Sequence, residues 1–593
     1  MRQAPDSAWN PGLQSDIPQP LCSKVTLFCE KNATVSYVEA LELADLTGLK
    51  ALELASLRPE RLVTHALLVR VTADLTVPDG PNYEDLGLNL RGMVKRIQTR
   101  HIKAIMPSID QALNAERKLA LQLVGELLSE GFQRKPAKTA TSFDNRSLFA
   151  RWFGKSDTPS EVVLSPEQLE LSALKDWKQQ ADDCDEPLMR ACFEALVKSV
   201  GSIIGHRGRM LPDHELVSRI VVNQVMNTHG GTIVDRMIDS VWNEAIEKEG
   251  YRLLPAQSQP VVMNVKGASA SGKSTIRPQQ RRLAQKLDIP WEDFALISPD
   301  YWRKYLLDYA SLGHDYKYGA MLTGRELEIV DKKLDHYMAA KASNGTMSHL
   351  LIDRFRFDSF TVGIDRNSDS RLLSRFGHQV YLFFMVTHPA ETVMRAFSRG
   401  KKTGRFKAVD DLLFHNVEAF TGMPALFLSW VNSRDKQVHF EFLDNDVAEG
   451  TLPRTAAFGR NNTLVVLDVA LLLNIDRYRK VDIAAQGPED IFTVEDSEAR
   501  RNTDFVVHCA ATVDCMVFAD QETMLEYAVV RAGVLVWWDH SYVQQNAYST
   551  DLLCALEVLG YKAEPCTGAK EDYIDTLDVE AEKRVLVGHW SAR

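Results

Sequence analysis

Hydrophobic residues recur along the chain in two patterns that predict where strands and helices lie. Apolar runs of roughly 4 to 8 residues are typical of buried strands, whereas apolar residues spaced three and four apart are typical of one face of a helix. The run 261–265, Val-Val-Met-Asn-Val, predicts a buried strand. Similar runs predict further strands at 294–298, 350–352, 380–387, 438–443, 464–467, 505–510 and 534–537.

Helical spacing dominates the chain before residue 261. It predicts helices at 106–128, 188–204, 213–228 and 231–250, and again near the C-terminus at 521–531 and 550–559. Between 261 and 443 the predicted strands alternate with helical stretches, which indicates a parallel sheet with right-handed crossovers. Ligands of such sheets bind at the carboxyl ends of the strands, so the polar residues that end each strand are the candidate site.

The first of these strand ends carries a phosphate-binding pattern. Gly267, Gly272, Lys273 and Ser274 match G-x-x-x-x-G-K-[ST] directly after a predicted strand. A loop with these glycines can turn its backbone N–H groups onto a triphosphate, Lys273 would reach the β and γ phosphates, and Ser274 would bind Mg²⁺. The alternative is a chance glycine turn between a strand and a helix. The predicted ATP contacts are Gly267, Ala268, Ser269, Ala270, Ser271, Gly272, Lys273, Ser274 and Thr275.

The second predicted strand ends in Ser-Pro-Asp-Tyr-Trp-Arg, which places Asp300 at the same edge of the sheet. A carboxylate there could accept the proton of an attacking hydroxyl, so Asp300 is the candidate catalytic base. Arg303 follows one helical turn later and could hold the anionic part of a substrate. A helix N-cap is the structural alternative for Asp300 and is compatible with the catalytic role.

The third predicted strand ends in Asp353, within Leu-Leu-Ile-Asp. An acidic residue at this place beside a phosphate loop commonly orders Mg²⁺ through its water shell. The neighbouring charges, beginning with Arg354, leave a surface ion-pair cluster as the alternative. After the fifth strand, residues 444–446 (Asp-Asn-Asp) lie where adenine or ribose contacts are often made, and a simple turn also explains them.

A basic segment follows the fourth predicted strand. Residues 395–407 contain six Lys or Arg and no acid, and Arg395 and Arg399 share a helical face. With Gly400 and Gly404 as hinges, the segment suits a lid that closes arginines, Arg405 included, onto a transferring phosphate. A solvated basic face is the alternative. Residues 255–450 carry a net charge of +3 in a chain of net charge −11, so the one basic region is the one that would hold phosphates.

These segments together resemble the zeta-toxin family of P-loop kinases. The resemblance rests on GASASGKST, ISPDYWR, LLID and RAFSRGKKTGRF, and it covers 261–446. It implies that Asp300 is the base, that Arg303 contacts the substrate, and that Arg395, Arg399 and Arg405 contact ATP and the transferred phosphate. It also implies a nucleotide-sugar acceptor such as UDP-N-acetylglucosamine, whereas other zeta-like enzymes phosphorylate a ribose hydroxyl of a dinucleotide. A protein inhibitor, or antitoxin, is a further partner that the resemblance leaves open.

Two features depart from the family pattern. The family usually has an acidic residue shortly before the catalytic one, whereas Ser298 stands two residues before Asp300. The insert 303–349 is long and contains several tyrosines. Because that insert would line the acceptor pocket, the usual acceptor of the family does not transfer directly to this chain.

Composition limits the partners and the cellular compartment that can be expected for this chain. The chain is 45% hydrophobic and 25% charged, as in ordinary soluble proteins, and its acidic net charge argues against a nucleic-acid partner. No window approaches the roughly 18 apolar residues of a membrane span, and there is no secretory signal. Eight cysteines without metal-ligand spacing favour a reduced, cytoplasmic setting. Export as a secreted effector stays open, since a polar N-terminal tail is compatible with it.

The sequence therefore predicts an α/β protein with a P-loop kinase core on a parallel five-stranded sheet, preceded by a mainly helical region and followed by a small α/β domain. The predicted parts are a disordered tail (1–22), a mainly helical domain (23–132), a linker (133–166), a helical domain (167–254), the kinase domain (255–450) and a C-terminal α/β domain (451–593). The predicted function is transfer of the γ-phosphate of ATP, with Mg²⁺, to a hydroxyl of a small nucleotide-like molecule. The alternatives are a polynucleotide 5′-hydroxyl kinase and a nucleotide-operated regulator without catalysis.

Overall fold

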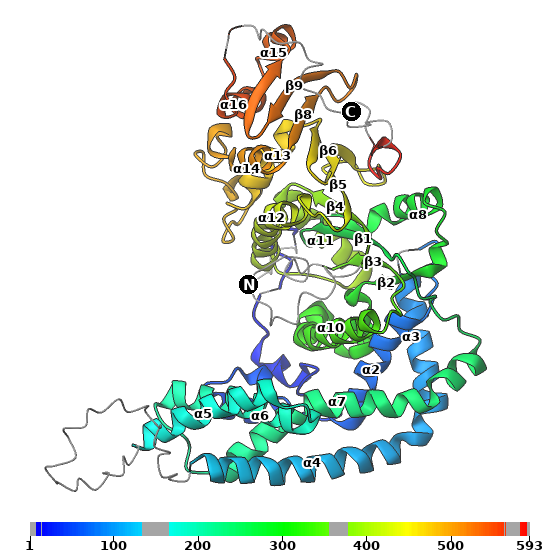
Figure 1. Ribbon diagram of the computed structural model, residues 1–593, viewed down its shortest axis with the longest axis vertical. Coiled ribbons are helices and arrows are strands. Elements are labelled where there is room, and N and C mark those ends of the chain that lie inside the picture. Colours follow the sequence, from blue (N-terminus) through cyan, green and yellow to red (C-terminus); the bar gives the residue numbers. More distant parts are fainter. Residues whose placement is uncertain are drawn as a thin grey trace, which may run out of the picture. The chain divides into compact units, whose positions relative to one another are not determined.

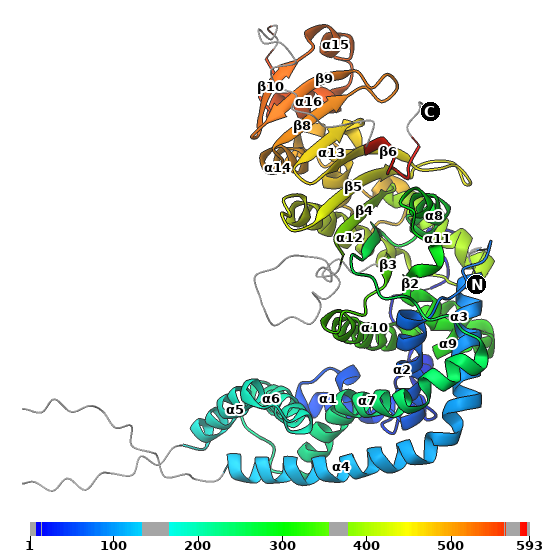
Figure 2. The ribbon, with the colours of Figure 1, turned by 45° about the vertical axis from the view of Figure 1, so that its right-hand side comes forward.

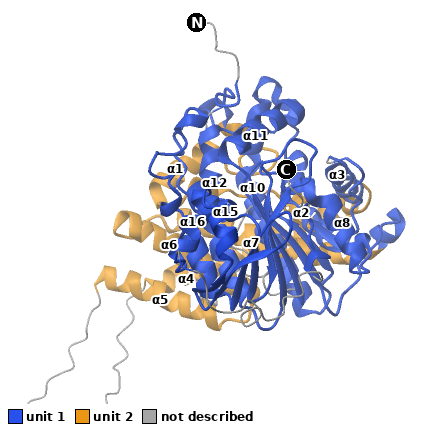
Figure 3. Ribbon diagram, turned by 90° about the horizontal axis from the view of Figure 1, so that it is seen from above, with its two compact units in different colours: residues 1–21, 67–97, 244–593 blue, residues 22–66, 98–243 orange. Residues whose placement is uncertain are grey.

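A computed structural model describes residues 7–13, 15–82, 84–132, 165–354, 377–562, 564 and 582–589. The chain divides into two compact units, which Figure 3 shows in different colours. The first unit comprises residues 1–21, 67–97 and 244–593, and the second comprises 22–66 and 98–243. The predicted linker lies outside the described residues except for its last two positions.

The first unit is built on one mixed sheet of ten strands, visible in Figures 1 and 2. The strand order is β10-β9-β8-β7-β6-β5-β4-β1-β3-β2, and the strands β1 to β5 pair in parallel with one another. The strands are β1 (Val261–Gly267), β2 (Phe294–Ile297), β3 (His349–Asp353), β4 (Gln379–Val386), β5 (Gln437–Asp444), β6 (Arg454–Arg460), β7 (Thr463–Val466), β8 (Cys515–Ala519), β9 (Glu526–Arg531) and β10 (Val534–Trp538).

This sheet confirms the α/β class and corrects the predicted architecture. The sequence analysis expected a five-stranded parallel sheet and a separate domain after residue 450. Instead, β6 pairs antiparallel with β5, and β7 to β10 extend the same sheet. The polar stretch 445–453, which contains Gly450 and Pro453, resembles a domain boundary in sequence, but it is the loop of an antiparallel β5–β6 connection.

Helices connect and cover these strands. The first unit contains the later part of α2 (Pro59–Asp74), α3 (Asp85–Ile97), α8 (Arg277–Lys286), α9 (Arg303–Leu306), α10 (Gly319–Ser343), α11 (Pro389–Thr403), α12 (Val409–Val431), α13 (Val469–Tyr478), α14 (Asp504–Thr512), α15 (His540–Gln545) and α16 (Thr550–Val558). The helix α11 shows how its ends are fixed. The His388 imidazole accepts a hydrogen bond from the Ala390 N–H at 3.2 Å, and Gly404 ends the helix with a left-handed φ of 76°.

Phenylalanine side chains form the core where strands and helices of both sequence halves meet. Phe427 of α12 packs against Phe384 of β4 and Phe442 of β5, with ring centroids 6.4 Å and 5.4 Å apart. Phe505 of α14 lies 5.9 Å from the same ring. All four side chains are buried. This cluster joins residues on either side of the predicted boundary at 450, which is a further reason that the two parts form one unit.

Replacing Phe427 by Ala is expected to lower the free energy of unfolding by about 3–5 kcal/mol, because the cavity that is left cannot refill. Urea denaturation followed by tryptophan fluorescence would measure the change. Phe414→Ala is the matched control, since Phe414 lies on the same helix with 52% of its surface exposed and should change stability by less than about 0.5 kcal/mol. Equal losses in both variants would contradict the assignment of Phe427 to the core.

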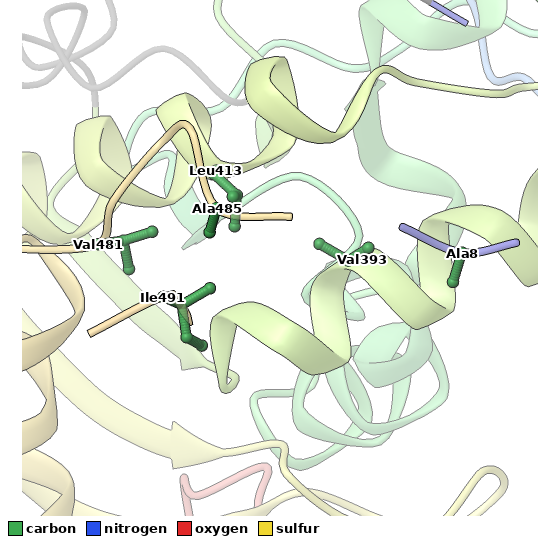
Figure 4. Close-up of a cluster of buried hydrophobic side chains, with 6 residues drawn as sticks. All are labelled: Ala8, Val393, Leu413, Val481, Ala485 and Ile491. Atoms are coloured by element: carbon green, nitrogen blue, oxygen red, sulfur yellow. The ribbon is translucent and has the colours of Figure 1, made fainter. Parts of the chain in front are cut away.

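The N-terminal segment differs from the disordered tail that was expected. Within 1–22 the structure describes residues 7–13 and 15–22, and Ala8 and Leu13 are buried. Leu13 packs with Phe406 and Ala408, and the Lys317 ammonium donates a hydrogen bond to the Pro11 carbonyl at 2.9 Å. Ala8 belongs to the buried cluster of Figure 4, with Val393, Leu413, Val481, Ala485 and Ile491. Apolar packing therefore orders a segment whose composition is polar.

The second unit is helical, as the sequence predicted. Its helices are α1 (Tyr37–Thr47), α4 (Lys103–Gly131), α5 (Pro166–Asp183), α6 (Pro187–Arg207) and the greater part of α7 (His214–Glu249). The helix α7 replaces the two helices that were expected on either side of Gly230. A side chain at Gly230 would meet Met226 and Leu113 at 3.1 Å and 3.3 Å, so this glycine permits close packing of α7 against α4 and does not end the helix.

Two expectations from composition can be compared with the structure. Within the described ranges, no helix combines the length and the hydrophobicity that a membrane crossing requires. The seven cysteines that the structure describes are all free thiols. The absence of a disulfide among them agrees with the absence of a disulfide pattern in the sequence.

Candidate functional site

The phosphate-loop motif lies between β1 and a helical turn, at the point where the strand order changes direction. In the sheet, β1 has β3 and β2 on one side and β4 and β5 on the other, which is the position where α/β sheets bind ligands. Residues Lys273–Ile276 form a 3-10 turn and α8 follows directly, so Pro278 lies in the first turn of α8. Proline is tolerated at this position, because an N–H in the first turn has no partner within the helix.

The loop backbone needs its small residues. Gly272 and Ala270 have left-handed φ angles of 90° and 65°. A side chain at Gly267 would lie 2.8 Å from the Met385 carbonyl oxygen, and no larger residue fits there. The Thr275 hydroxyl donates to the Gly272 carbonyl at 2.7 Å. The loop Gly267–Gly272 is therefore shaped by close contact with β4 as well as by its own glycines.

Two residues that the sequence analysis did not assign to the loop hold it in place. The Ser271 carbonyl accepts hydrogen bonds from the Thr387 hydroxyl at 3.0 Å and from the Asn445 amide at 2.7 Å. Thr387 follows β4 and Asn445 follows β5. The sequence contains a signal that could have identified both residues: each follows a predicted parallel strand, and polar residues that follow neighbouring parallel strands meet at the same edge of the sheet. Asn445 was assigned to adenine, ribose or a turn, and in the structure it supports the phosphate loop.

Lys273 folds over its own loop and faces the acidic residues of the site. Its ammonium donates to the Gly267 and Ala268 carbonyls at 3.0 Å and 2.8 Å. Burial lowers the pKa of Lys273, and the carboxylates of Asp353 and Asp300 act in the opposite direction. An incoming phosphate could take over the two carbonyl-bound N–H groups, which makes Lys273 ready for an anionic ligand.

Asp300 lies opposite this loop in the 3-10 turn Pro299–Trp302 after β2. Its side chain is 46% exposed, and both carboxylate oxygens are bound: Oδ1 to Arg303 Nε at 2.9 Å and Oδ2 to an Arg405 guanidinium nitrogen at 2.6 Å. Partial loss of water around the carboxyl opposes ionisation, but Arg405 and Arg303 outweigh it and hold the pKa of Asp300 well below its usual range. Asp300 is therefore a carboxylate at every physiological pH.

Arg303 connects Asp300 to α10 through hydrogen bonds and thereby orients the Asp300 carboxylate. Its Nη1 nitrogen donates to the Ala320 carbonyl at 2.6 Å and to the Thr323 hydroxyl at 3.1 Å, both at the start of α10. Because Arg303 joins Asp300 to Ala320 and Thr323, the geometry favours a role in positioning Asp300. The substrate role that the resemblance implies for Arg303 stays a prediction.

The turn that carries Asp300 is supported by helices from residues 67–97. The Trp302 indole is fully buried and donates to the Thr72 hydroxyl at 3.2 Å. Arg91 of α3 donates to the Tyr301 carbonyl at 3.3 Å. These helices were expected in a separate N-terminal domain, and no local pattern connects them to residues 210 and 230 positions later. They nevertheless fix the backbone from which Asp300 projects.

The three lid arginines take different positions. Arg405 reaches Asp300, whereas Arg395 donates to the Asn445 and Val447 carbonyls at 2.8 Å and 3.1 Å. Arg399 lies close enough to Lys273 and Asp300 to influence the pKa of both. The structure therefore brings Arg405 and Arg399 to the site. It places Arg395 on the loop after β5, where a nucleotide base or ribose would be expected.

The two predicted metal ligands lie at the same edge. Asp353 is the last residue of β3 and pairs with Val265 of β1, two residues before the loop begins. Ser274 lies in the turn after Lys273. A hydroxyl and a carboxylate are the oxygen ligands that Mg²⁺ prefers, and no hydrogen bond from another described side chain reaches the Asp353 carboxylate. The residues present fit Mg²⁺.

Further polar side chains border Asp300 that sequence reasoning did not single out. The Tyr309 hydroxyl, from the tyrosine-containing insert, lies near Arg303, Arg405 and Asp300, and burial raises its pKa. Lys407, which lies just before α12, and Asp411 and His415 of α12 form a second polar group, and His415 is within electrostatic reach of Asp300 and Arg303. Comparisons of the chain with protein-family models, with curated proteins and with solved structures gave no match.

Proposed function

We propose that the chain is an ATP-dependent kinase that transfers the γ-phosphate of ATP to a hydroxyl of a small nucleotide-like molecule. The ion pair between Asp300 and Arg405, within electrostatic reach of Lys273, carries the proposal. It brings together a loop suited to a triphosphate, a carboxylate suited to take a proton, and a lid arginine suited to a phosphoryl group. On this proposal, the parallel strands around β1 form a P-loop kinase core within the larger sheet.

The loop would bind ATP through its backbone N–H groups and Lys273. Lys273 would exchange its two carbonyl contacts for the β and γ phosphates, which are stronger, charged acceptors. Ser274 would ligate Mg²⁺ directly and Asp353 through water. When bound, the metal would supply positive charge for the β and γ oxygens.

Asp300 would take the proton of the acceptor hydroxyl as the new oxygen–phosphorus bond forms. The bond between the γ-phosphorus and the bridging oxygen breaks in the same step, and ADP leaves with that oxygen. Because Arg303 keeps Oδ1, the acceptor hydroxyl needs Oδ2, which Arg405 holds in the absence of ATP. Arg405 would move from Asp300 to the γ-phosphate when ATP binds, and this exchange would expose the base only in the ATP-bound state.

The acceptor class follows from the zeta-like resemblance and from the surroundings of Asp300. A nucleotide sugar or a dinucleotide carries both a hydroxyl and phosphates, and the basic side chains around Asp300 suit such a molecule. Tyr309 offers a hydroxyl and an aromatic ring on the acceptor side. A zeta-like kinase could also have a protein inhibitor as partner.

A mass-spectrometric screen tests this function. The protein is incubated with Mg-ATP and a metabolite extract, with heat-inactivated protein as the control. The expected result is a nucleotide-like species heavier by one phosphoryl group. Phosphorylation of 5′-hydroxyl oligonucleotides in preference to small molecules would favour the polynucleotide kinase. In that case the affinity for the oligonucleotide should depend strongly on the salt concentration. ATP binding without any phosphorylated product would favour the regulator.

A further inference from the structure

Lys407 occupies a defined position beside the proposed site, at the end of the basic segment and just before α12. Its ammonium lies 3.3 Å from Asp411 Oδ2 and contacts the His415 imidazole nitrogen Nδ1. Asp411 and His415 are four residues apart on α12, with His415 Nε2 3.6 Å from Asp411 Oδ1. Only 16% of the Lys407 side chain is exposed. A carboxylate and an imidazole therefore hold this lysine in one orientation.

This cluster lies within electrostatic reach of Asp300. The charged groups that face Lys407 are Asp411 from α12, Arg303 from α9 and Arg399 from α11. His415 is in turn influenced by Lys407, Lys273, Arg303 and Asp300. Charged side chains from three separate helices, α9, α11 and α12, therefore lie near the Lys407 ammonium.

The surroundings of Lys407 disfavour the charged form of its ammonium group. Burial, together with the like charges of Arg303 and Arg399, lowers the pKa of Lys407 to about 8, even though Asp411 opposes the change. Burial and the charge of Lys407 lower the pKa of His415 to about 3, so the imidazole is neutral and can accept a hydrogen bond. Burial of an ionisable group beside like charges is common at sites with a binding or catalytic role. An ammonium also has three N–H donors, and Asp411 and His415 account for two of them.

We propose that Lys407 is a further phosphate-binding residue of the kinase site, with Asp411 and His415 as its positioning residues. This inference rests on the proposed function. The ligand is a phosphate oxygen on the acceptor side, which belongs either to the phosphoryl group in transfer or to a phosphate of the acceptor itself. In either case the third N–H of Lys407 would donate a charge-assisted hydrogen bond to a phosphate oxygen close to the reacting atoms.

Three variants test the proposal. Lys407→Met removes the charge at nearly constant length, Lys407→Arg keeps a charge that does not titrate, and Lys402→Met is the control, from the same basic segment with 66% exposure. With Mg-ATP and either UDP-N-acetylglucosamine or NAD as acceptor, kcat/KM should fall about 10- to 100-fold in Lys407→Met, the effect of losing a hydrogen bond to a charged group. Lys402→Met should match the wild type.

The pH profile separates a charge effect from a structural one. The wild-type rate should decline above about pH 8, where Lys407 loses its proton. This decline should be absent from Lys407→Arg, because a guanidinium stays protonated there. A lysine that only supported packing would produce no such difference.

Titration calorimetry with Mg-ADP and aluminium fluoride, a mimic of the transferring group, identifies the source of the phosphate. If Lys407→Met loses the tighter binding that fluoride confers and keeps its affinity for Mg-ADP, Lys407 contacts the phosphoryl group. If instead only the KM of the acceptor rises, Lys407 contacts the acceptor phosphate. Both results support the proposal. It is overturned if Lys407→Met equals Lys402→Met in every assay, with the high-pH decline retained in Lys407→Arg. Failure of the kinase function itself would be seen separately, as no transfer by the wild type.

Discussion

The variant Asp300→Asn is expected to lose most phosphoryl transfer, with kcat lower by about 10²- to 10⁴-fold. Asparagine has nearly the same shape and can accept a hydrogen bond from the acceptor hydroxyl, but it cannot take the proton. The phosphate loop and Lys273 lie on β1 and the following turn, so the affinity for Mg-ATP should be nearly unchanged. Loss of turnover with retained ATP binding is the signature of an interaction made only in the transition state.

Steady-state kinetics and titration calorimetry measure the two quantities separately. Asp514→Asn is the control, because it makes the same chemical change at an exposed position at the start of β8. Asp300→Asn also removes the charge that pairs with Arg303 and Arg405, so its thermal unfolding should be recorded beside the kinetics. Turnover equal to that of the wild type would exclude Asp300 as the base and leave a nucleotide-operated regulator as the better account.

The second large effect is expected for Arg405→Ala, with kcat lower by about 10³-fold or more, as for arginines that stabilise a transferring phosphoryl group. Arg405 pairs with Asp300 at 2.6 Å in the absence of ATP and would transfer to the γ-phosphate. Arg405→Lys should recover only part of the rate, because an ammonium cannot reproduce the planar, two-point contact of a guanidinium. Arg500→Ala is the control, with 76% exposure and a surface ion pair to Glu557.

The pH dependence of Arg405→Ala should also differ from that of the wild type. Arg405 and Arg303 hold the pKa of Asp300 below its usual range before ATP binds, so the wild-type kcat/KM, which reports the free enzyme, should not fall on the acid side until well below pH 4. A base is active only when deprotonated, and removal of Arg405 lets the pKa of Asp300 rise. The acid limb of Arg405→Ala should therefore move to higher pH than that of the wild type. An acid limb that stays in place, with kcat preserved, would show that Arg405 does not act on Asp300 or the phosphate.

Sequence patterns predicted the parts of the fold in which short-range order decides the structure. The strand–loop–helix unit around Gly267 to Thr275 and the acidic residues after β2 and β3 were expected at the carboxyl edge, and they lie there. An apolar run followed by glycines is a local signal, and parallel strands bring their ends together without any long-range information. Asp300 was named as a site residue for this reason, whereas Arg405, 105 residues later, was named because it lies in the basic segment and because of the zeta-toxin resemblance.

Elements that depend on distant contacts were missed. The run 505–510 was predicted as a strand because it is short and apolar, but it lies in α14, where the Phe505 N–H donates to the Asp476 carboxylate at 2.6 Å. The stretch 521–531 was predicted as a helix, and it contains β9, which pairs with both β8 and β10. In each case a partner from another part of the chain overrides local propensity.

In the site, too, the contacts that depend on distant parts of the chain were not predicted from the sequence. Arg303 was expected to bind substrate, but its contacts with Ala320 and Thr323 arise from the fold of the insert, which the sequence did not define. The support of Trp302 by Thr72 joins residues 230 positions apart and leaves no local pattern. The expected boundary near residue 450 failed because a loop between antiparallel strands has the same composition as a linker.

The position of the γ-phosphate relative to Asp300 tests the account most directly. A crystal structure with Mg-ADP and aluminium fluoride would record it. The account predicts fluoride between Lys273 and Asp300, with Arg405 moved from the carboxylate to the fluoride. Nucleotide bound away from the Gly267–Gly272 loop, or an Arg405–Asp300 ion pair that persists while the fluoride lies out of reach of Asp300, would contradict it.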